Sequence, residues 1–170
     1  MSVPPLPAPD HRCQECGFDY AAGSLDDALA GIAAVPASLK AALADVPPER
    51  RHGRPAPGVW SVAEYVCHLR DVYVTSTIRL YRTRTEDRPV LEPMLNDLRA
   101  ARFRYDQRDP VAVVDEIAAA VAGLADEAAR FAAGDWTRTA TRLPGEERTA
   151  DWLVRHALHE GVHHVQDLRR

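Results

Sequence analysis

Residues 61–84, SVAEYVCHLRDVYVTSTIRLYRTR, carry the strongest helix-start signal in the sequence. Ser61 followed three residues later by Glu64 is the pattern of a capping box, in which each residue satisfies a free backbone N–H of the other. Trp60, directly before the cap, is a candidate for the hydrophobic staple that fixes the direction of the incoming chain. The stretch therefore predicts a long helix that begins after Ser61.

Three more stretches show apolar residues at helical spacing, and each follows a residue suited to an N-cap. They are 25–46 after Ser24, 110–133 after Asp109, with Pro110 at the first helical position, and 150–170 after Thr149. The stretch 85–109 looks irregular with a short helix inside it, and 135–148 looks like a polar connection. No run predicts a β-sheet. Four helices of this length predict an all-α protein, a four-helix bundle over residues 24–170.

The composition fits one globular domain and argues against several classes of function. The chain has 170 residues, enough to bury a substantial core, and its net charge of -4 does not favour binding to nucleic acid or acidic lipid. Arginines in 79–108 could hold carboxylates of a small-molecule thiol or form a nucleic-acid patch. Solvated surface is the interpretation that we favour, because acidic residues are interspersed among them. No stretch approaches the ~20 apolar residues of a membrane span, and the start lacks the pattern of a signal peptide. Three cysteines do not suit a secreted disulfide framework, so we expect a cytoplasmic protein with reduced thiols.

The stretch HEGVH, residues 159–163, has the H-E-x-x-H pattern of zinc metalloproteases. His159 and His163 are four positions apart, so on a helix both imidazoles project from one face and can hold one metal ion. His156 lies on a nearby face, and His164 points about a quarter turn away. In a metalloprotease of this kind the third ligand lies downstream, but only HVQDLRR follows here. The pattern therefore predicts a metal site and argues against a protease.

The third ligand must come from the earlier part of the chain. His11 lies in an N-terminal cysteine motif, and His52 lies in a loop rich in proline. His68 lies midway along the capped helix, where a bundle can turn it toward the last helix. We therefore expect a metal site formed by His68, His159 and His163.

Several motifs together resemble the DinB/YfiT-like superfamily over residues from about 24 to 170. They are the Trp-Ser-x-x-Glu start of WSVAEYVCHLRDV, the histidine four residues after that glutamate, the central YDQRDP segment and the final H-x-x-x-H-x-x-Q. The resemblance implies a four-helix bundle, often dimeric, with a zinc, nickel or other divalent ion such as iron or manganese. Carried over by position, the family's metal-binding histidines fall on His68, His159 and His163, and Gln166 matches a polar position after them.

Characterised relatives in this superfamily include transferases and isomerases that use bacillithiol, mycothiol or glutathione. Three neutral imidazoles leave a coordination position open, where a metal can activate either a water or a thiol. The leading functional prediction is therefore transfer of a low-molecular-weight thiol, of the mycothiol or bacillithiol type, to a small electrophile. A metal-dependent hydrolase is the first alternative, and a non-catalytic, stress-associated metal-binding module is the second. The expected partners are a small-molecule substrate and, from the resemblance, a second copy of the chain.

Three further residues are candidates for catalytic roles. Glu160, next to His159, could approach a bound water or thiol as a base, although a solvent-facing helix charge is the interpretation that we favour. Tyr65 and Asp71 share a helical face with His68 and could orient that imidazole or a substrate. Helical phase is the basis for both assignments.

The N-terminal extension, residues 1–23, contains the motif CQECG. Cys13 and Cys16 at this spacing form half of a zinc-ribbon-like site, and the glycine that follows relaxes the turn. His11 is a candidate third ligand for a structural metal, and His52 is a candidate fourth. Reduced thiols without a metal, or a redox pair, are the alternatives.

Overall fold

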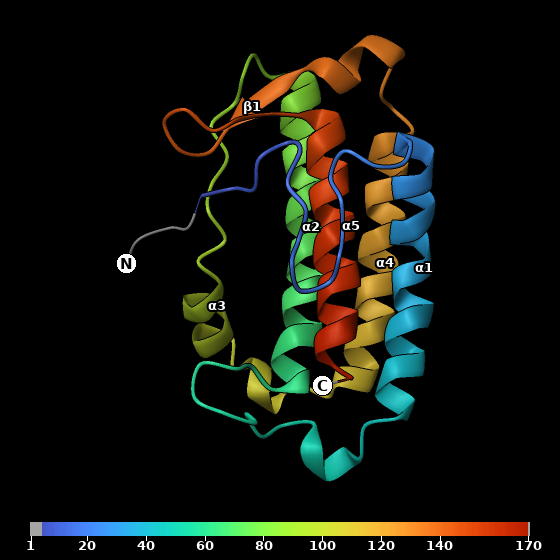
Figure 1. Cartoon of the computed structure of the whole chain (residues 1–170), viewed down its shortest axis with the longest axis vertical. Helices are drawn as coiled ribbons and strands as arrows, with labels where there is room; N and C mark the ends of the chain where they lie inside the picture. Colours follow the sequence, from blue (N-terminus) through green and yellow to red (C-terminus); the bar gives the residue numbers. More distant parts are fainter. Residues whose placement is uncertain (1–4, 170) are drawn as a thin grey trace.

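The structure is a computed structural model that describes residues 5–169, and four long helices dominate it (Figure 1). They are α1 (Leu25–Ala44), α2 (Val62–Thr85), α4 (Pro110–Ala128) and α5 (Ala150–Asp167). A short α-helix, several 3₁₀ helices and a pair of strands lie between them in the described part of the chain. These are η1 (Pro48–Arg50), α3 (Asn96–Arg102), η2 (Tyr105–Gln107), η3 (Ala133–Thr137), β1 (Thr139–Thr141) and β2 (Glu147–Thr149).

The four long helices pack as a bundle in which neighbours along the chain are not always neighbours in space. α1 and α2 each pack against both α4 and α5, so α1 and α2 lie diagonally opposite. Aliphatic side chains from all four helices fill the core, and burial of each contributes about 1.5–3 kcal/mol. The most deeply buried are Ile32, Leu39, Val66, Leu69, Leu80, Val113, Ile117, Leu124 and Val154. The predicted all-α four-helix bundle is confirmed.

The helices begin at the caps predicted from the sequence. The Ser61 side chain accepts a hydrogen bond from the Glu64 backbone N–H, and the Glu64 carboxylate accepts one from the Ser61 N–H at 2.8 Å. The ring centroids of Trp60 and Tyr65 lie 5.6 Å apart, as a hydrophobic staple requires. The other predicted N-caps, Ser24, Asp109 and Thr149, are also confirmed.

The stretch 135–148 is more than a polar connection, because most of a β-hairpin lies in it. β1 and β2 pair antiparallel with Ala140 opposite Arg148, and Gly145 turns the chain between them with a φ of 82°. The prediction that no run forms a sheet is therefore wrong for these residues. Strands of three residues are too short for an alternating apolar pattern to identify them.

α1 is long and apolar enough to cross a membrane by length and composition alone, a test that a core helix of a bundle also passes. One helix of this kind does not establish a membrane span. In the structure, α1 packs along α4 and α5 and buries Ile32, Val35 and Leu39 in the bundle. Its apolar residues therefore serve as a face of the core.

The described part of the N-terminal extension lies against α5 and the hairpin (Figure 1). The Leu6 N–H donates to Glu146 at 2.7 Å, and Arg148 donates to the Pro7 carbonyl at 3.0 Å. Further along, the buried Tyr20 ring stacks on Trp152 of α5 with 5.4 Å between centroids. These contacts bring the cysteine motif onto the histidine-rich side of α5.

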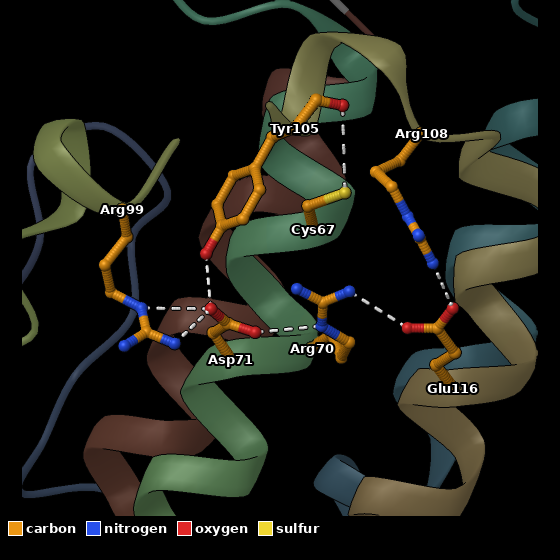
Figure 2. Close-up of polar contacts among 7 residues, drawn as sticks. All are labelled: Cys67, Arg70, Asp71, Arg99, Tyr105, Arg108 and Glu116. Carbon is orange, nitrogen blue, oxygen red and sulfur yellow. Dashed lines mark hydrogen bonds and ion pairs between the residues drawn. The ribbon is translucent and has the colours of Figure 1, made fainter. Parts of the chain in front are cut away.

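Asp71 of α2 is the centre of a buried polar network that also includes α3, η2 and α4 (Figure 2). Its carboxylate accepts hydrogen bonds from Tyr105, from Arg99 at 2.6 Å and from Arg70 at 2.8 Å. Arg70 also pairs with Glu116 of α4 at 2.9 Å. Burial acts to raise the pKa of Asp71, but the three donors outweigh it and hold this pKa below its ordinary value.

Replacing Asp71 by Asn is expected to destabilise the protein by about 3 kcal/mol at pH 7, because the arginines lose a buried charged partner. The pKa of Asp71 is lower in the folded chain than in the unfolded chain. Its stabilising contribution is therefore complete above the unfolded value of ~3.9 and is lost as the pH falls through the folded value. Urea unfolding of both proteins from neutral to acidic pH measures this difference. A difference that stayed constant across the range would contradict the role of the charge.

Gly161 lets α5 approach α1 and α2 closely. A Cβ added at this position would overlap the Tyr73 hydroxyl and lie 2.8 Å from Cγ2 of Val35. Tyr73 and Val35 are both buried, so neither has free space into which it can move. The absence of a side chain at Gly161 therefore sets how deeply α5 lies between its neighbours.

Gly161→Ala is expected to lower the free energy of unfolding by about 1–2 kcal/mol. Overpacking costs about 1–3 kcal/mol, and the better helix propensity of alanine offsets up to about 1 kcal/mol of it. Gly123→Ala in α4 is the matched control, because an added Cβ there meets no atom within 4 Å; it is expected to stabilise by about 0.5–1 kcal/mol. Urea unfolding of both variants measures the contrast, and a stabilised Gly161→Ala protein would show that the contact is not tight.

Candidate functional site

α5 presents a row of side chains that can bind a metal to α2 and to the N-terminal extension. They are His156, His159, Glu160, His163 and His164. The ring centroids of His159 and His163 lie 5.3 Å apart, and those of His163 and His164 lie 5.2 Å apart. Together with neighbouring residues, these side chains form several groups whose potential ligand atoms lie close together. Two of the groups connect α5 to another part of the fold.

The first group connects α5 to α2 through His68, Glu160 and His164. Nε2 of His68 lies 3.0 Å from Oε2 of Glu160, and Nε2 of His164 lies 3.6 Å from the same oxygen. One potential ligand atom of each residue lies within 4.8 Å of the others. Two imidazoles and one carboxylate are a ligand set of catalytic zinc sites, which keep a further position open.

Neighbouring side chains hold these potential ligands in orientation. Nδ1 of His164 lies 2.8 Å from Oδ2 of Asp167, which leaves Nε2 of His164 on the side of Glu160. The His68 ring is buried and lies 5.2 Å from the Trp60 ring between centroids. A carboxylate on the far nitrogen of a metal-binding histidine fixes its tautomer and raises its basicity. The surroundings of His164 therefore fit a metal ligand.

The charges in this group also suit a cation. Burial lowers the pKa of His68, which keeps its imidazole neutral at pH 7. Burial acts against the charge of Glu160, but hydrogen bonds with His164 and His68 outweigh it and hold the pKa of Glu160 well below its ordinary value. Burial also lowers the pKa of His164, whereas Asp167 and Glu160 raise it to about 9 overall. Binding of a metal would release the proton of His164, as metal binding to histidine generally does.

The second group connects α5 to the N-terminal extension through Cys13, Cys16, His159 and His163. Their potential ligand atoms also lie within 4.8 Å of one another, and Sγ of Cys13 is 3.5 Å from Nδ1 of His163. The three predicted ligands are thus divided between the groups, with His68 in the first and His159 and His163 in the second. None of the groups found in residues 5–169 contains all three.

The residues predicted to be catalytic lie in three different surroundings. Glu160 is 20% exposed and bonded to His68, which contradicts the interpretation as a solvent-facing helix charge. The Tyr65 ring lies 5.0 Å from the His164 ring between centroids, next to the first group. Asp71 uses its carboxylate for the network with Arg70, Arg99 and Tyr105 (Figure 2).

His11 and His52, the predicted third and fourth ligands of the cysteine motif, lie outside the group that contains Cys13 and Cys16. His11 is exposed, and Nδ1 of His52 lies 2.7 Å from a backbone carbonyl of η2. Histidines of α5, far away in the sequence, stand next to the cysteines instead.

His164 and Asp167 are not among the residues predicted for the site. Glu160 and His164 are four positions apart, so they share a helical face just as His159 and His163 do. This second pair at the same spacing is the signal that could have identified His164. Asp167 follows three positions after His164 and could have been identified as its partner.

Two cavities border the first group. The smaller, of about 390 Å³, is lined by His68, His156, Glu160, Arg79 and Arg142 among other residues. The larger, of about 1140 Å³, is lined by His164, Trp60, Tyr65 and Asp167 among others. Members of one potential ligand set therefore contribute to the walls of both cavities.

Comparisons with known proteins agree with this architecture. Among solved structures, YfiT from Bacillus subtilis is similar to this chain, with 21% identity, 86% of each chain covered and a TM-score of 0.75. That protein is described as a probable metal-dependent hydrolase with an unusual four-helix bundle topology. At this identity the likeness shows the fold alone. No curated protein matches the chain.

The family follows from the sequence as well as from the bundle. The model of the DinB superfamily matches residues 31–168, which include α2 and the whole histidine-rich part of α5. The resemblance seen in the sequence motifs is therefore confirmed, and this chain belongs to the DinB superfamily.

Proposed function

We propose that this protein is a divalent-metal-dependent enzyme that transfers a low-molecular-weight thiol to a small anionic electrophile. The observation that carries the proposal is the position of His68, Glu160 and His164 between two cavities. A hydrolase needs room for one organic substrate and water, whereas a transferase needs room for two organic molecules that meet at one reacting centre.

His68, Glu160 and His164 would hold the metal through Nε2, Oε2 and Nε2, the atoms that already converge. A divalent ion in this set supplies Lewis acidity, which favours the thiolate form of a thiol at neutral pH. Asp167 keeps the His164 ring in place, and Trp60 covers the His68 ring. These contacts limit the motion of the ligands and exclude water from one side of the group.

The larger cavity suits the thiol cosubstrate. Its volume of about 1140 Å³ lies just above the usual range of ligand pockets, roughly 300–1,000 Å³, and leaves room for a thiol with sugar or peptide substituents. Trp60 and Tyr65 offer it aromatic surfaces beside His164. The thiol sulfur would then approach the group from the side of His164.

The smaller cavity suits an electrophile that carries a carboxylate. Arg79 and Arg142 both line it, and guanidinium groups pair well with planar anions. Arg142 is already paired with Glu146 at 3.1 Å, so Arg79 is the residue proposed to bind the carboxylate. Nε of Arg79 is buried and has no hydrogen-bond partner among the described residues, although another nitrogen of the same group donates to the Glu92 carbonyl at 2.7 Å. A buried donor of this kind is most easily satisfied by a bound anion.

The reaction balances as an addition. The sulfur of the thiol forms a bond to one carbon of an activated double bond, and the thiol proton ends on the neighbouring carbon. No oxidant, reductant or further co-reactant is needed. A reversible addition of this type would also permit isomerisation of the double bond.

A hydrolase is the alternative that the description of YfiT favours. The same three residues could serve it, because a metal in such a set also lowers the pKa of water toward ~7. The larger cavity would then have no role in the reaction. Metal identity (zinc or nickel), the mycothiol or bacillithiol type of thiol, homodimerisation and a cytoplasmic location stay predictions of the sequence.

His68→Ala is expected to bind one divalent ion per chain fewer than the wild type. Its thiol-conjugating activity should fall by at least about 100-fold, because loss of a residue that only supports a metal ligand already costs about 10- to 100-fold. His52→Ala is the matched control, because His52 is exposed and lies outside the groups that could hold a metal. Metal analysis and a screen of thiols against small carboxylated electrophiles measure both quantities. Full metal occupancy in His68→Ala would contradict the site.

The same screens distinguish the three functions. Activity of the wild type on esters or amides, with none toward any thiol, would show a hydrolase. A metal-loaded protein that is inert in both screens would show a non-catalytic module.

Arg79→Met is expected to raise KM for a carboxylated electrophile by about 10- to 100-fold, which corresponds to loss of one charged hydrogen bond of about 1.5–3 kcal/mol. The turnover number should change little, because Arg79 binds the substrate and does not hold the metal. Arg82→Met is the control, since Arg82 bonds to Glu86 and the Val90 carbonyl on the outside of α2. Steady-state kinetics with charged and neutral electrophiles separate these effects. An equal change of KM for both substrates would argue against an anion site.

A further inference from the structure

Cys13, Cys16, His159 and His163 form a compact group between the N-terminal extension and α5. The group borders the proposed active site, because His159 lines the smaller cavity and His163 lines the larger one. Potential ligand atoms of all four lie within 4.8 Å of one another, and Sγ of Cys13 is 3.5 Å from Nδ1 of His163. Zinc binds cysteine sulfur and histidine nitrogen at about 2.0–2.3 Å, so its tetrahedral ligands lie roughly 3.5 Å apart. The group needs little movement to reach this arrangement.

We propose that these four residues bind a structural zinc ion, which fastens the N-terminal extension to α5. The order Cys-x-x-Cys followed by His-x-x-x-His is the ligand spacing of a closed Cys₂His₂ site. Two thiolates neutralise the charge of the ion, and four protein ligands leave no open position. The site therefore serves stability and not catalysis.

The backbone around the cysteines has the shape of a zinc-binding turn. The Cys13 N–H donates to the Phe18 carbonyl at 2.8 Å, and the Gly17 N–H donates to the Cys13 carbonyl at 2.9 Å. Gly17 has a φ of 74°, a conformation that residues with a side chain rarely adopt. A bridge between Arg12 and Asp19 closes the hairpin. The hairpin presents both sulfurs to α5 without help from a disulfide, since all three cysteines are free.

His159 is oriented as a metal ligand by a tyrosine. The Tyr20 hydroxyl lies 2.9 Å from Nδ1 of His159, and Tyr20 itself is buried. The other ring nitrogen, Nε2, is buried and has no hydrogen-bond partner among the described residues. A polar atom in this condition is uncommon in a folded protein unless an ion or water satisfies it. An ion between Nε2 and the two sulfurs would satisfy it and explain the role of Tyr20.

A zinc ion at this site would also stabilise one wall of the smaller cavity. Residues 5–7 line the smaller cavity, and they are followed within a few residues by the cysteine hairpin. Their other anchors are hydrogen bonds to Glu146 and Arg148 of the β-hairpin region. Fastening the cysteine hairpin to α5 therefore holds one wall of the cavity in place.

Metal content and cobalt spectroscopy of the full chain test the proposal independently of enzyme activity. Wild-type protein is expected to bind two zinc ions per chain, and the double variant with Cys13→Ser and Cys16→Ser is expected to bind one. After replacement of zinc by Co²⁺, the wild type should show near-ultraviolet thiolate-to-cobalt absorption and the strong visible bands of a tetrahedral site. The double cysteine variant should lose the thiolate absorption, and His163→Ala should weaken both cobalt binding and the visible bands of the tetrahedral site. His68→Ala should keep it, because that residue belongs to the other group.

Two control variants distinguish this ligand set from its alternatives. Cys67→Ala removes the cysteine outside the group and should leave metal content and absorption unchanged. His11→Ala should also leave them unchanged. Weakened cobalt binding in this variant, with none in His163→Ala, would overturn the ligand set. Equal zinc content in the wild type and the double cysteine variant would overturn the site itself. Trypsin cleavage after Arg12 should accelerate in the double variant, whereas an unchanged rate would contradict the fastening role.

Discussion

The hydrogen bond between His68 and Glu160 is the contact on which the arrangement of this protein's polar interior depends. It connects α2 to α5 at 3.0 Å, at the border of the smaller cavity. A largely buried carboxylate without partners would cost several kcal/mol, so Glu160 requires compensation from its surroundings. His68 and His164 both supply it, and Asp167 in turn holds His164. One charge on α5 therefore fixes the orientation of residues on two helices.

This contact requires α5 to lie deep between its neighbours. Gly161, next to Glu160, meets Tyr73 of α2 and Val35 of α1, and Gly31 of α1 leaves space for Leu158 of α5. Both glycines thus remove side chains where helices come closest, and α5 can then turn its polar residues toward α2 and the N-terminal extension. Packing of α1 and α2 on opposite corners places α5 between them. The potential metal ligands of α5 consequently face α2 in one group and the N-terminal extension in the other.

Local signals predicted the bundle well, because the features that start helices act over only a few residues. The caps at Ser24 and Thr149 and the capping box of Ser61 depend on neighbours in the sequence, and all are present. The β-hairpin at 139–149 was not predicted, since strands this short are stabilised by pairing with each other and by the Leu91 N–H, which donates to the Thr141 carbonyl at 2.6 Å. The network of Asp71 was equally hidden, because its donors come from α2, α3 and η2 (Figure 2). A helical face identifies which residues point the same way but not what they meet.

The sequence by itself determined the four helices, the family and the presence of metal-capable residues on the last helix. It also contained two overlapping pairs at the same spacing, His159 with His163 and Glu160 with His164. Spacing cannot choose between them, because each pair is equally suited to one helical face. Only the tertiary structure decided that His68 lies beside Glu160 and His164, while the cysteine hairpin lies beside His159 and His163. The physical reason is the rotation of α5 about its own axis, which the close contacts at Gly161 and the packing of the N-terminal extension fix and which no local signal encodes.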